Sequence, residues 1–271
     1  MIPRHEKAMP RNLETLNRSF AVQAPNFDSK SVNFTKKEYL DYTVDAASPA
    51  GTDIVLEVAA GTCACGRAFA PLVQTVVCLD LAAPMLQVGK KEAQESHLDN
   101  MVFVKGYAEE LPFLDNSFDI VLSRLAFHHF TDTDGVFHEM VRVLKPGGKL
   151  ILIDMEAADE PLRKTEDEIE TLRDPSHVKN LSREEILKLY SDNSLSVEKS
   201  EITEMQVHLS DWLELTKTAE PVRDKIIEKM ENDIGGKEKT GFNPYQTEKG
   251  ICFNQRWILT LGKSLCHNNK T

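Results

Sequence analysis

Several features that would narrow the function of this chain are missing from its sequence. No apolar run approaches the roughly 20 residues that a membrane-spanning helix needs, and residues 1–12 lack the apolar core of a signal peptide. The 32 basic residues are outnumbered by 43 acidic ones and are scattered, so the net charge of −11 disfavours a polyanionic partner. We therefore expect a cytoplasmic protein without a membrane span that binds neither DNA nor RNA.

The cysteines offer no metal site or disulfide framework. There are five of them, an odd number, and none forms a CxxC pair. Cys63 and Cys65 are separated by one residue, but no second ligand pair with the spacing of a zinc site follows. We expect reduced, mostly buried thiols and no bound metal.

What the sequence does contain is an alternation of short apolar runs and longer amphipathic ones. Runs at 53–58, 75–80, 101–105, 118–123 and 149–155 are apolar almost throughout, which is typical of parallel strands covered on both faces. Helical patterns at 66–74, 83–96 and 134–144 separate them. The segment LKPGGK at 144–149 is predicted to stop the third helix and to form a sharp turn. This order predicts a doubly wound, Rossmann-like α/β sheet.

The rest of the chain is predicted to complete one domain spanning 1–271. We assign an N-terminal cap to 1–45, a sheet core to 46–208 and 250–264, and a helical substrate lid to 209–249. Within the cap, residues 34–47 are expected to be helical and residues 18–31 to form a loop. The runs at 195–209 and 250–263 alternate as strands do and are expected to close one sheet edge as an antiparallel pair.

The loop after the first strand, VLEVAAGTCACG at 55–66, is poor in glycine. The dinucleotide pattern G-x-G-x-x-G would fall on Ala59, Gly61 and Ala64, which is a weak match. A nucleoside without phosphates requires fewer positions that lack a side chain. Asp80 ends the second strand, where a carboxylate can accept hydrogen bonds from both hydroxyls of a ribose.

Four segments in order carry a family resemblance. VLEVAAGTCACG, VVCLDLAAPML, KGYAEELPFLDNSFDIVLSRLAFHHF and RVLKPGGKLILID resemble the motifs of class I S-adenosylmethionine-dependent methyltransferases, most closely the ubiquinone/menaquinone-biosynthesis-like small-molecule branch, type 11. The resemblance implies a seven-stranded sheet of order 3-2-1-4-5-7-6 and S-adenosylmethionine as cofactor, with S-adenosylhomocysteine as product. It also implies a small-molecule acceptor.

The resemblance also implies cofactor contacts, position by position. Glu57 would lie near the amino-acid end, and Asp80 would hold the ribose. Tyr107 replaces the usual aspartate, so either it stacks on the adenine or Glu109 takes over the lost contact. The full set of expected cofactor-binding residues is Glu57, Ala59, Gly61, Cys63, Asp80, Leu81, Met85, Tyr107, Ala108, Glu109, Ser123, Arg124 and Leu125.

Three histidines are the candidates for proton transfer. His128 and His129 follow the fourth strand, and His177 lies in the segment RDPSHV. An imidazole can act as a general base because its pKa lies near neutral pH. Each also has a structural alternative, in capping, packing or a salt-bridged loop, and methyl transfer can proceed by positioning alone.

The predicted function is transfer of a methyl group from S-adenosylmethionine to a small acceptor by in-line displacement. Two alternatives remain open at this stage: an NAD-dependent oxidoreductase on the same sheet, and a non-catalytic cofactor-binding module. Both a monomer and a homodimer are compatible with the sequence.

Overall fold

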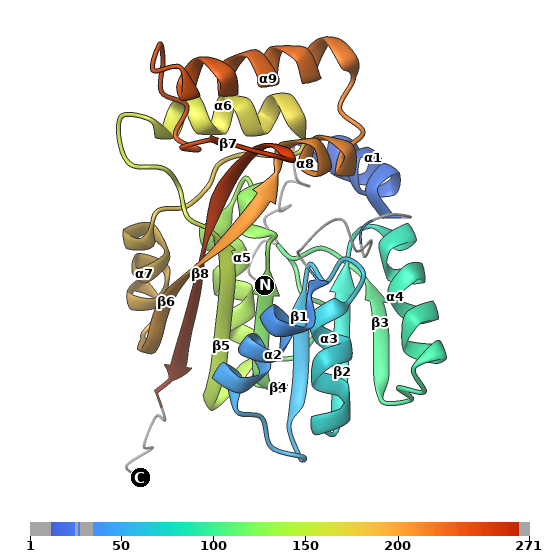
Figure 1. The fold of residues 1–271 in the computed structure, drawn as a ribbon. Coiled ribbons are helices and arrows are strands. Elements are labelled where there is room, and N and C mark those ends of the chain that lie inside the picture. Colours follow the sequence, from blue (N-terminus) through green and yellow to red (C-terminus); the bar gives the residue numbers. More distant parts are fainter. Residues whose placement is uncertain (1–11, 25–26, 28–34, 266–271) are drawn as a thin grey trace.

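The computed structural model describes residues 12–24, 27 and 35–265. Within these residues, eight strands form one sheet in the order β3-β2-β1-β4-β5-β8-β6, with β7 paired to β8 (Figure 1). The strands are β1 Ile54–Val58, β2 Thr75–Asp80, β3 Met101–Lys105, β4 Phe118–Arg124, β5 Leu144–Met155, β6 Leu195–His208, β7 Tyr245–Thr247 and β8 Gly250–Ser264.

The sheet topology confirms the predicted order. β1 to β5 are parallel to one another, and β8 lies antiparallel between β5 and β6. β8 takes the place of the seventh strand in the predicted order 3-2-1-4-5-7-6, because the short strand β7 precedes it. The expected antiparallel closing pair, β6 with β8, is thereby confirmed as well.

Helices cover both faces of this sheet, which explains why its central strands are apolar almost throughout. Val55 packs with α2 and α3 on one face, whereas the next residue, Leu56, packs with α5 and α7 on the other. The helices are α1 Leu13–Gln23, α2 Lys37–Ala47, α3 Ala64–Phe69, α4 Ala83–Glu95, α5 Thr133–Val143, α6 Arg163–Arg173, α7 Arg183–Asp192, α8 Leu209–Leu215 and α9 Glu220–Ile234, with 3-10 turns η3 Ala70–Leu72 and η4 Phe127–His129.

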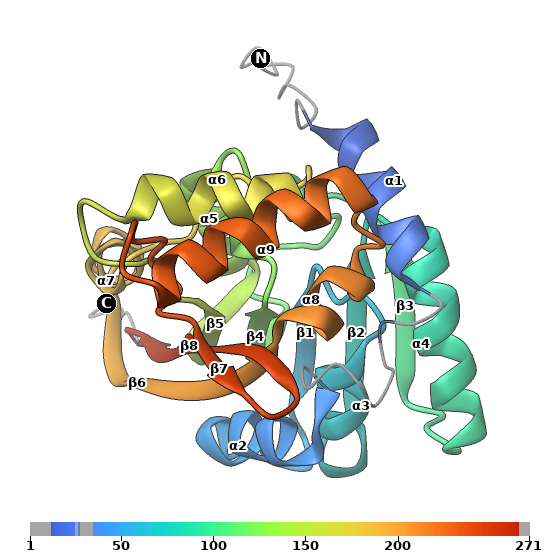
Figure 2. The same ribbon diagram turned by 45° about the horizontal axis from the view of Figure 1, so that its top comes forward.

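A separate helical layer lies over the carboxyl ends of the parallel strands. Figures 1 and 2 show α6 and α9 side by side across this edge, with α8 beneath them and α1 alongside. Ile169, Trp212 and Phe253 belong to a hydrophobic cluster that joins this layer to β8. The helices assigned to the lid at 209–249 therefore stand where a ligand of the sheet would bind. In the part of the chain that the structure describes, no helix has the length and apolar character of a membrane span.

Two local predictions were wrong. The loop expected at 18–31 is helical as far as Gln23, where α1 ends, while residues 25–26 and 28–34 lie outside the described part. The turn expected at LKPGGK is part of β5, which begins at Leu144 directly after α5. Gly147 has φ +76°, and the pairing of β4 with β5 shifts register between Phe118 and Ile120, so the Pro-Gly-Gly sequence forms an irregularity in the strand.

Candidate functional site

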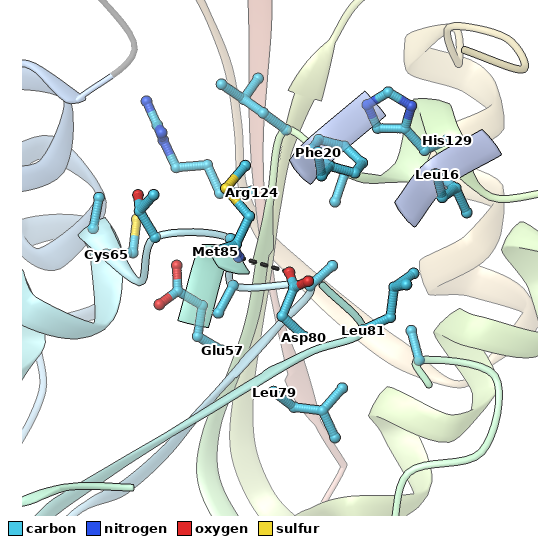
Figure 3. Close-up of a pocket in the computed structure, with 18 of the residues that line it drawn as sticks. Leu16, Phe20, Glu57, Cys65, Leu79, Asp80, Leu81, Met85, Arg124 and His129 are labelled. Carbon is cyan, nitrogen blue, oxygen red and sulfur yellow. Dashed lines mark hydrogen bonds between the residues drawn. The ribbon is translucent and has the colours of Figure 1, made fainter. Parts of the chain in front are cut away.

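The main cavity lies at the carboxyl ends of β1, β2 and β4. It encloses about 900 Å³, including its open mouth. Figure 3 shows Glu57 and Asp80 side by side on its strand side, with Arg124 above and Leu16, Phe20 and His129 on the opposite side. Such a position, outside the carboxyl ends of parallel strands, is where doubly wound sheets bind ligands.

The loop that follows β1 has the backbone conformation of a glycine-rich loop, although only one of its three left-handed residues is glycine. Ala59, Gly61 and Cys63 all have positive φ angles, of 54°, 53° and 60°. A left-handed conformation costs a non-glycine residue roughly 1–2 kcal/mol, so Ala59 and Cys63 are strained. A Cβ built on Gly61 would have no atom within 4 Å, which leaves this backbone open to a ligand.

Asp80 fastens this loop to the end of β2. Its Oδ2 accepts a hydrogen bond from Gly61 N at 2.7 Å, and its Oδ1 accepts one from Ala82 N at 2.7 Å. Only 8% of Asp80 is exposed. Burial raises the pKa of its carboxyl group, although these backbone donors oppose the shift.

Glu57 and Arg124 bring opposite charges to one end of the main cavity. Gly66 N donates to Glu57 Oε2 at 2.7 Å, and burial raises the pKa of Glu57 to about 7. Arg124 lies with its guanidinium 5.0 Å from the centre of the Trp257 ring, and burial lowers its pKa. The Arg124 charge favours the ionised form of Glu57, and the reverse also holds.

Most of the residues expected to bind the cofactor line this cavity. Glu57, Asp80 and Met85 lie there together with residues from three further loops. The expected residues on its wall are Glu57, Ala59, Gly61, Asp80, Leu81, Met85, Ala108, Glu109, Arg124 and Leu125.

Cys63, Tyr107 and Ser123 are not on that wall. A Cβ added to Gly89 of α4 would lie 2.8 Å from Cys63 Sγ, so this thiol fills the contact between the loop and α4. Ser123 is 0% exposed within the sheet, between β1 and β5. Tyr107 is 39% exposed, whereas Glu109 lines the cavity, so the geometry favours Glu109 among the two alternatives for the adenine contact.

A second cavity, here called the inner cavity, adjoins the main one. Its space, including the open mouth, amounts to about 450 Å³, and it shares Phe20, Leu125 and His129 with the main cavity. His128 lines it, and Nδ1 of His128 lies 2.6 Å from Asp154 Oδ1. A carboxylate so placed holds a proton on Nδ1 and leaves Nε2 as the atom that can accept one.

The charge of Asp154 decides the protonation of His128. Burial opposes the charged imidazole, but the Asp154 carboxylate outweighs burial, and the pKa of His128 is raised. Burial and the neighbouring His128 lower the pKa of His129 to about 3, so His129 is neutral at physiological pH. His128 is therefore the stronger base of the two.

His177 lines neither cavity, although its ring lies 5.7 Å from that of His128, centre to centre. Its Nε2 contacts Asp167 Oδ1 at 2.9 Å, and its side chain is 1% exposed. The segment that contains it is salt-bridged and hydrogen-bonded: Arg173 pairs with Glu170, and Asp174 accepts hydrogen bonds from Ser19 and Gln23 of α1. The structure thus uses RDPSHV to attach α1 to the helical layer.

Sequence reasoning did not identify the contribution of α1. Leu16 and Phe20 line the main cavity, and the Phe20 ring lies 5.0 Å from that of His129, centre to centre. Their spacing of four residues is a helical signal, but the segment around Phe20 was interpreted as a loop.

Comparison with known proteins places this geometry in a family. Residues 56–152 match the family model described as a methyltransferase domain. The chain is 32% identical over 209 residues to the uncharacterised methyltransferase YcgJ of Bacillus subtilis, covering 77% of this chain and 82% of that protein. The crystal structure of YcgJ aligns with a TM-score of 0.78 and 30% identity over 85% of this chain and 99% of YcgJ.

The chain belongs to the class I methyltransferases. This confirms the resemblance drawn from the four motifs and, for the family, S-adenosylmethionine as methyl donor. A ubiquinone/menaquinone biosynthesis C-methyltransferase of Hahella chejuensis is 38% identical over 125 residues, which cover 45% of this chain and half of that enzyme. Phosphoethanolamine N-methyltransferase 2 of Haemonchus contortus, solved with S-adenosyl-L-methionine, shares the fold with a TM-score of 0.65 at 18% identity over 97% of this chain and 61% of that one.

Proposed function

We propose that this methyltransferase transfers a methyl group from S-adenosylmethionine, bound in the main cavity, to a small-molecule acceptor in the inner cavity. The observation that carries the proposal is the composition of the main cavity. One carboxylate stands at the end of β2, an oppositely charged pair stands at the end of β1 and β4, and apolar side chains separate them from the solvent.

The donor groups on the wall fit the nucleoside part of the cofactor. Each oxygen of Asp80 already accepts one backbone hydrogen bond, and a carboxylate oxygen has two lone pairs, so each can accept one more from a ribose hydroxyl. Leu81, Met85 and Ala108 provide an apolar site for the adenine, with Glu109 as acceptor for its amino group.

The charged pair fits the amino-acid part. Glu57 is suited to the α-ammonium group and Arg124 to the α-carboxylate, because Glu57 is buried and Arg124 half-buried at one end of the cavity and the two carry the complementary charges. An ammonium beside Glu57 would restore the ionised form that burial disfavours. The open backbone at Gly61 leaves room beside this pair.

The chain's own residues would position the acceptor and receive its proton. When bound, S-adenosylmethionine supplies a methyl group on a sulfonium that is open to in-line displacement. Leu16 and Phe20 of α1 cover the main cavity and limit the access of water. His128, held by Asp154, can take a proton from the acceptor at Nε2.

Calorimetric titration with S-adenosylhomocysteine and NADH tests the first part of the proposal, the identity of the cofactor. We expect one molecule of S-adenosylhomocysteine per chain and no measurable binding of NADH. Tight binding of NADH alone would support the oxidoreductase alternative. Mass spectrometry of cell extract incubated with the enzyme and isotope-labelled S-adenosylmethionine then identifies the acceptor, and a screen without any labelled product would support a non-catalytic binding module.

A further inference from the structure

A third cavity, here called the acidic cavity, lies beneath the helical layer and has no role in the account so far. It encloses about 1140 Å³, including its mouth, between α6, β7 and the adjoining parts of β5 and β8. Its lining contains a set of carboxylates: Glu156, Asp159, Glu166, Glu170 and Glu204. Among the described residues on its wall, Arg256 is the single basic side chain, and Arg256 is paired with Glu156 at 2.6 Å.

Two buried amides in this wall have an oxygen without a hydrogen-bond partner. Asn180 is 2% exposed, and its Nδ2 faces Glu166 Oε2 at 3.4 Å, which leaves Oδ1 unpaired. Gln255 is 7% exposed, and its Nε2 faces Met155 Sδ at 3.1 Å, which leaves Oε1 unpaired. Buried polar atoms are normally satisfied. Both orphans are acceptors, so the missing partner is a hydrogen-bond donor.

The carboxylates are too dispersed to hold a metal ion. Glu166 accepts a hydrogen bond from Ala158 N at 2.8 Å, and Glu170 pairs with Arg173 at 3.1 Å. In the part of the chain that the structure describes, no three His, Cys, Asp or Glu side chains converge on one point. An ammonium group, a compact charge with three hydrogen-bond donors, is a better match to separated acceptors.

Aromatic side chains and the raised pKa of Glu166 also favour a cationic ligand. Phe242, Tyr245 and Phe253 also line the acidic cavity, and aromatic rings attract organic cations. Burial raises the pKa of Glu166 to about 7, opposed by Ala158 N and supported by the charge of Glu170, as expected for a carboxylate with no cation beside it.

The acidic cavity adjoins the inner cavity. Met155 and Gln255 line both of them, and the inner cavity in turn shares His129 with the main cavity. A molecule held in the acidic cavity therefore lies next to the space in which the methyl acceptor is placed.

We propose that the acidic cavity binds the ammonium group of an amine-bearing acceptor, with the unpaired oxygens of Asn180 and Gln255 and the carboxylate of Glu166 as its ligands. The inference rests on the proposed function and names the substrate class of the same site. The ammonium acts here as an anchor, so that the reacting atom belongs to the other end of the molecule.

The test compares probes that differ only in the charged group. n-Hexylamine and n-hexanol, and 2-phenylethylamine and 2-phenylethanol, are titrated by ligand-observed NMR into enzyme saturated with S-adenosylhomocysteine. We expect each amine to bind at least tenfold more tightly than its alcohol. In Glu166→Gln this preference falls at least fivefold, and in Glu204→Gln, an exposed position at the rim, it falls by a smaller factor in a chain that folds normally.

The control is Glu168→Gln, which removes the same charge from the exposed side of α6. We expect the preference for amines to survive in this variant. Equal affinity for amine and alcohol in the wild-type enzyme overturns the inference, and so does an equal loss in Glu168→Gln and Glu166→Gln, which would trace the preference to the general negative charge. The affinity for S-adenosylhomocysteine is measured in the same samples. If the enzyme did not bind S-adenosylhomocysteine, the proposed function itself would be refuted, and not only this subsite.

Discussion

Replacement of Asp80 by Asn gives the sharpest test of how the main cavity holds its ligand. The carboxylate accepts Gly61 N and Ala82 N at 2.7 Å each, and one lone pair remains on each oxygen. Asn presents a single oxygen, so its amide nitrogen faces one of these N–H donors and one of the two ribose hydroxyls loses its acceptor. A hydrogen bond to a charged group contributes about 1.5–3 kcal/mol. We therefore expect S-adenosylhomocysteine to bind about 10- to 100-fold more weakly.

The assay is isothermal titration with S-adenosylhomocysteine, after circular dichroism has established that the variant is folded. The matched control is Asp119→Asn on strand β4. Asp119 Oδ2 accepts Ile54 N at 2.9 Å and Lys145 Nζ at 2.7 Å at the start of β1, the opposite end of the strand from the cavity. This control should lose stability but retain its affinity within twofold. Unchanged affinity in folded Asp80→Asn would refute the assignment of Asp80 to the ribose.

Four further outcomes are expected. His128→Ala should lower kcat by about 10²- to 10⁴-fold with little change in cofactor affinity, and full activity would leave catalysis to positioning alone. A general base must be unprotonated, and Asp154 raises the pKa of His128, so kcat of the wild-type enzyme should fall as the pH drops through a midpoint above 6.5. In Asp154→Asn this midpoint should move to lower pH. An unchanged pH profile would show that Asp154 does not set the pKa of the base. Gly66→Ala would put a methyl group 2.6 Å from Cys78 Sγ, so thermal unfolding should reveal a loss of about 1–3 kcal/mol, and unaltered stability would contradict this tight contact. Ser182→Ala removes the hydroxyl that accepts Glu185 N in a capping box and should cost about 1 kcal/mol in the same assay, with no effect on ligand affinity.

The fold was predictable where local pattern and tertiary environment agree. The strands at 75–80 and 101–105 were predicted with the bounds that the structure has, because unbroken apolar runs determine their own limits. The turn predicted at 144–149 was wrong because local pattern and tertiary environment disagree there. Its Pro-Gly-Gly sequence favours a turn locally, but pairing with β4 incorporates it into β5.

In the candidate site, the positions set by the sheet topology were likewise predictable, whereas the orientations set by side-chain packing were not. Glu57 and Asp80 lie at the carboxyl ends of β1 and β2, and Gly61 lies in the loop after β1, so the sheet topology alone brings them together. Cys63 lies two residues after Gly61 and Ser123 lies on β4, but both side chains are buried in packed regions, which a sequence position alone cannot reveal. Motif position thus predicts where the loop lies, but it does not predict where each side chain points.

The acidic cavity had no sequence signal. Asn180 follows α6, and Gln255 lies on β8, 75 residues later (255 − 180). Neither position belongs to a motif, and only the packing of the helical layer over the sheet brings their amides to one wall.

The most direct measurement is a crystal structure of the enzyme soaked with S-adenosylhomocysteine. The ribose should lie within hydrogen-bond distance of both oxygens of Asp80, with the amino-acid end between Glu57 and Arg124. An empty main cavity, or a nucleoside bound elsewhere on the chain, would contradict the account.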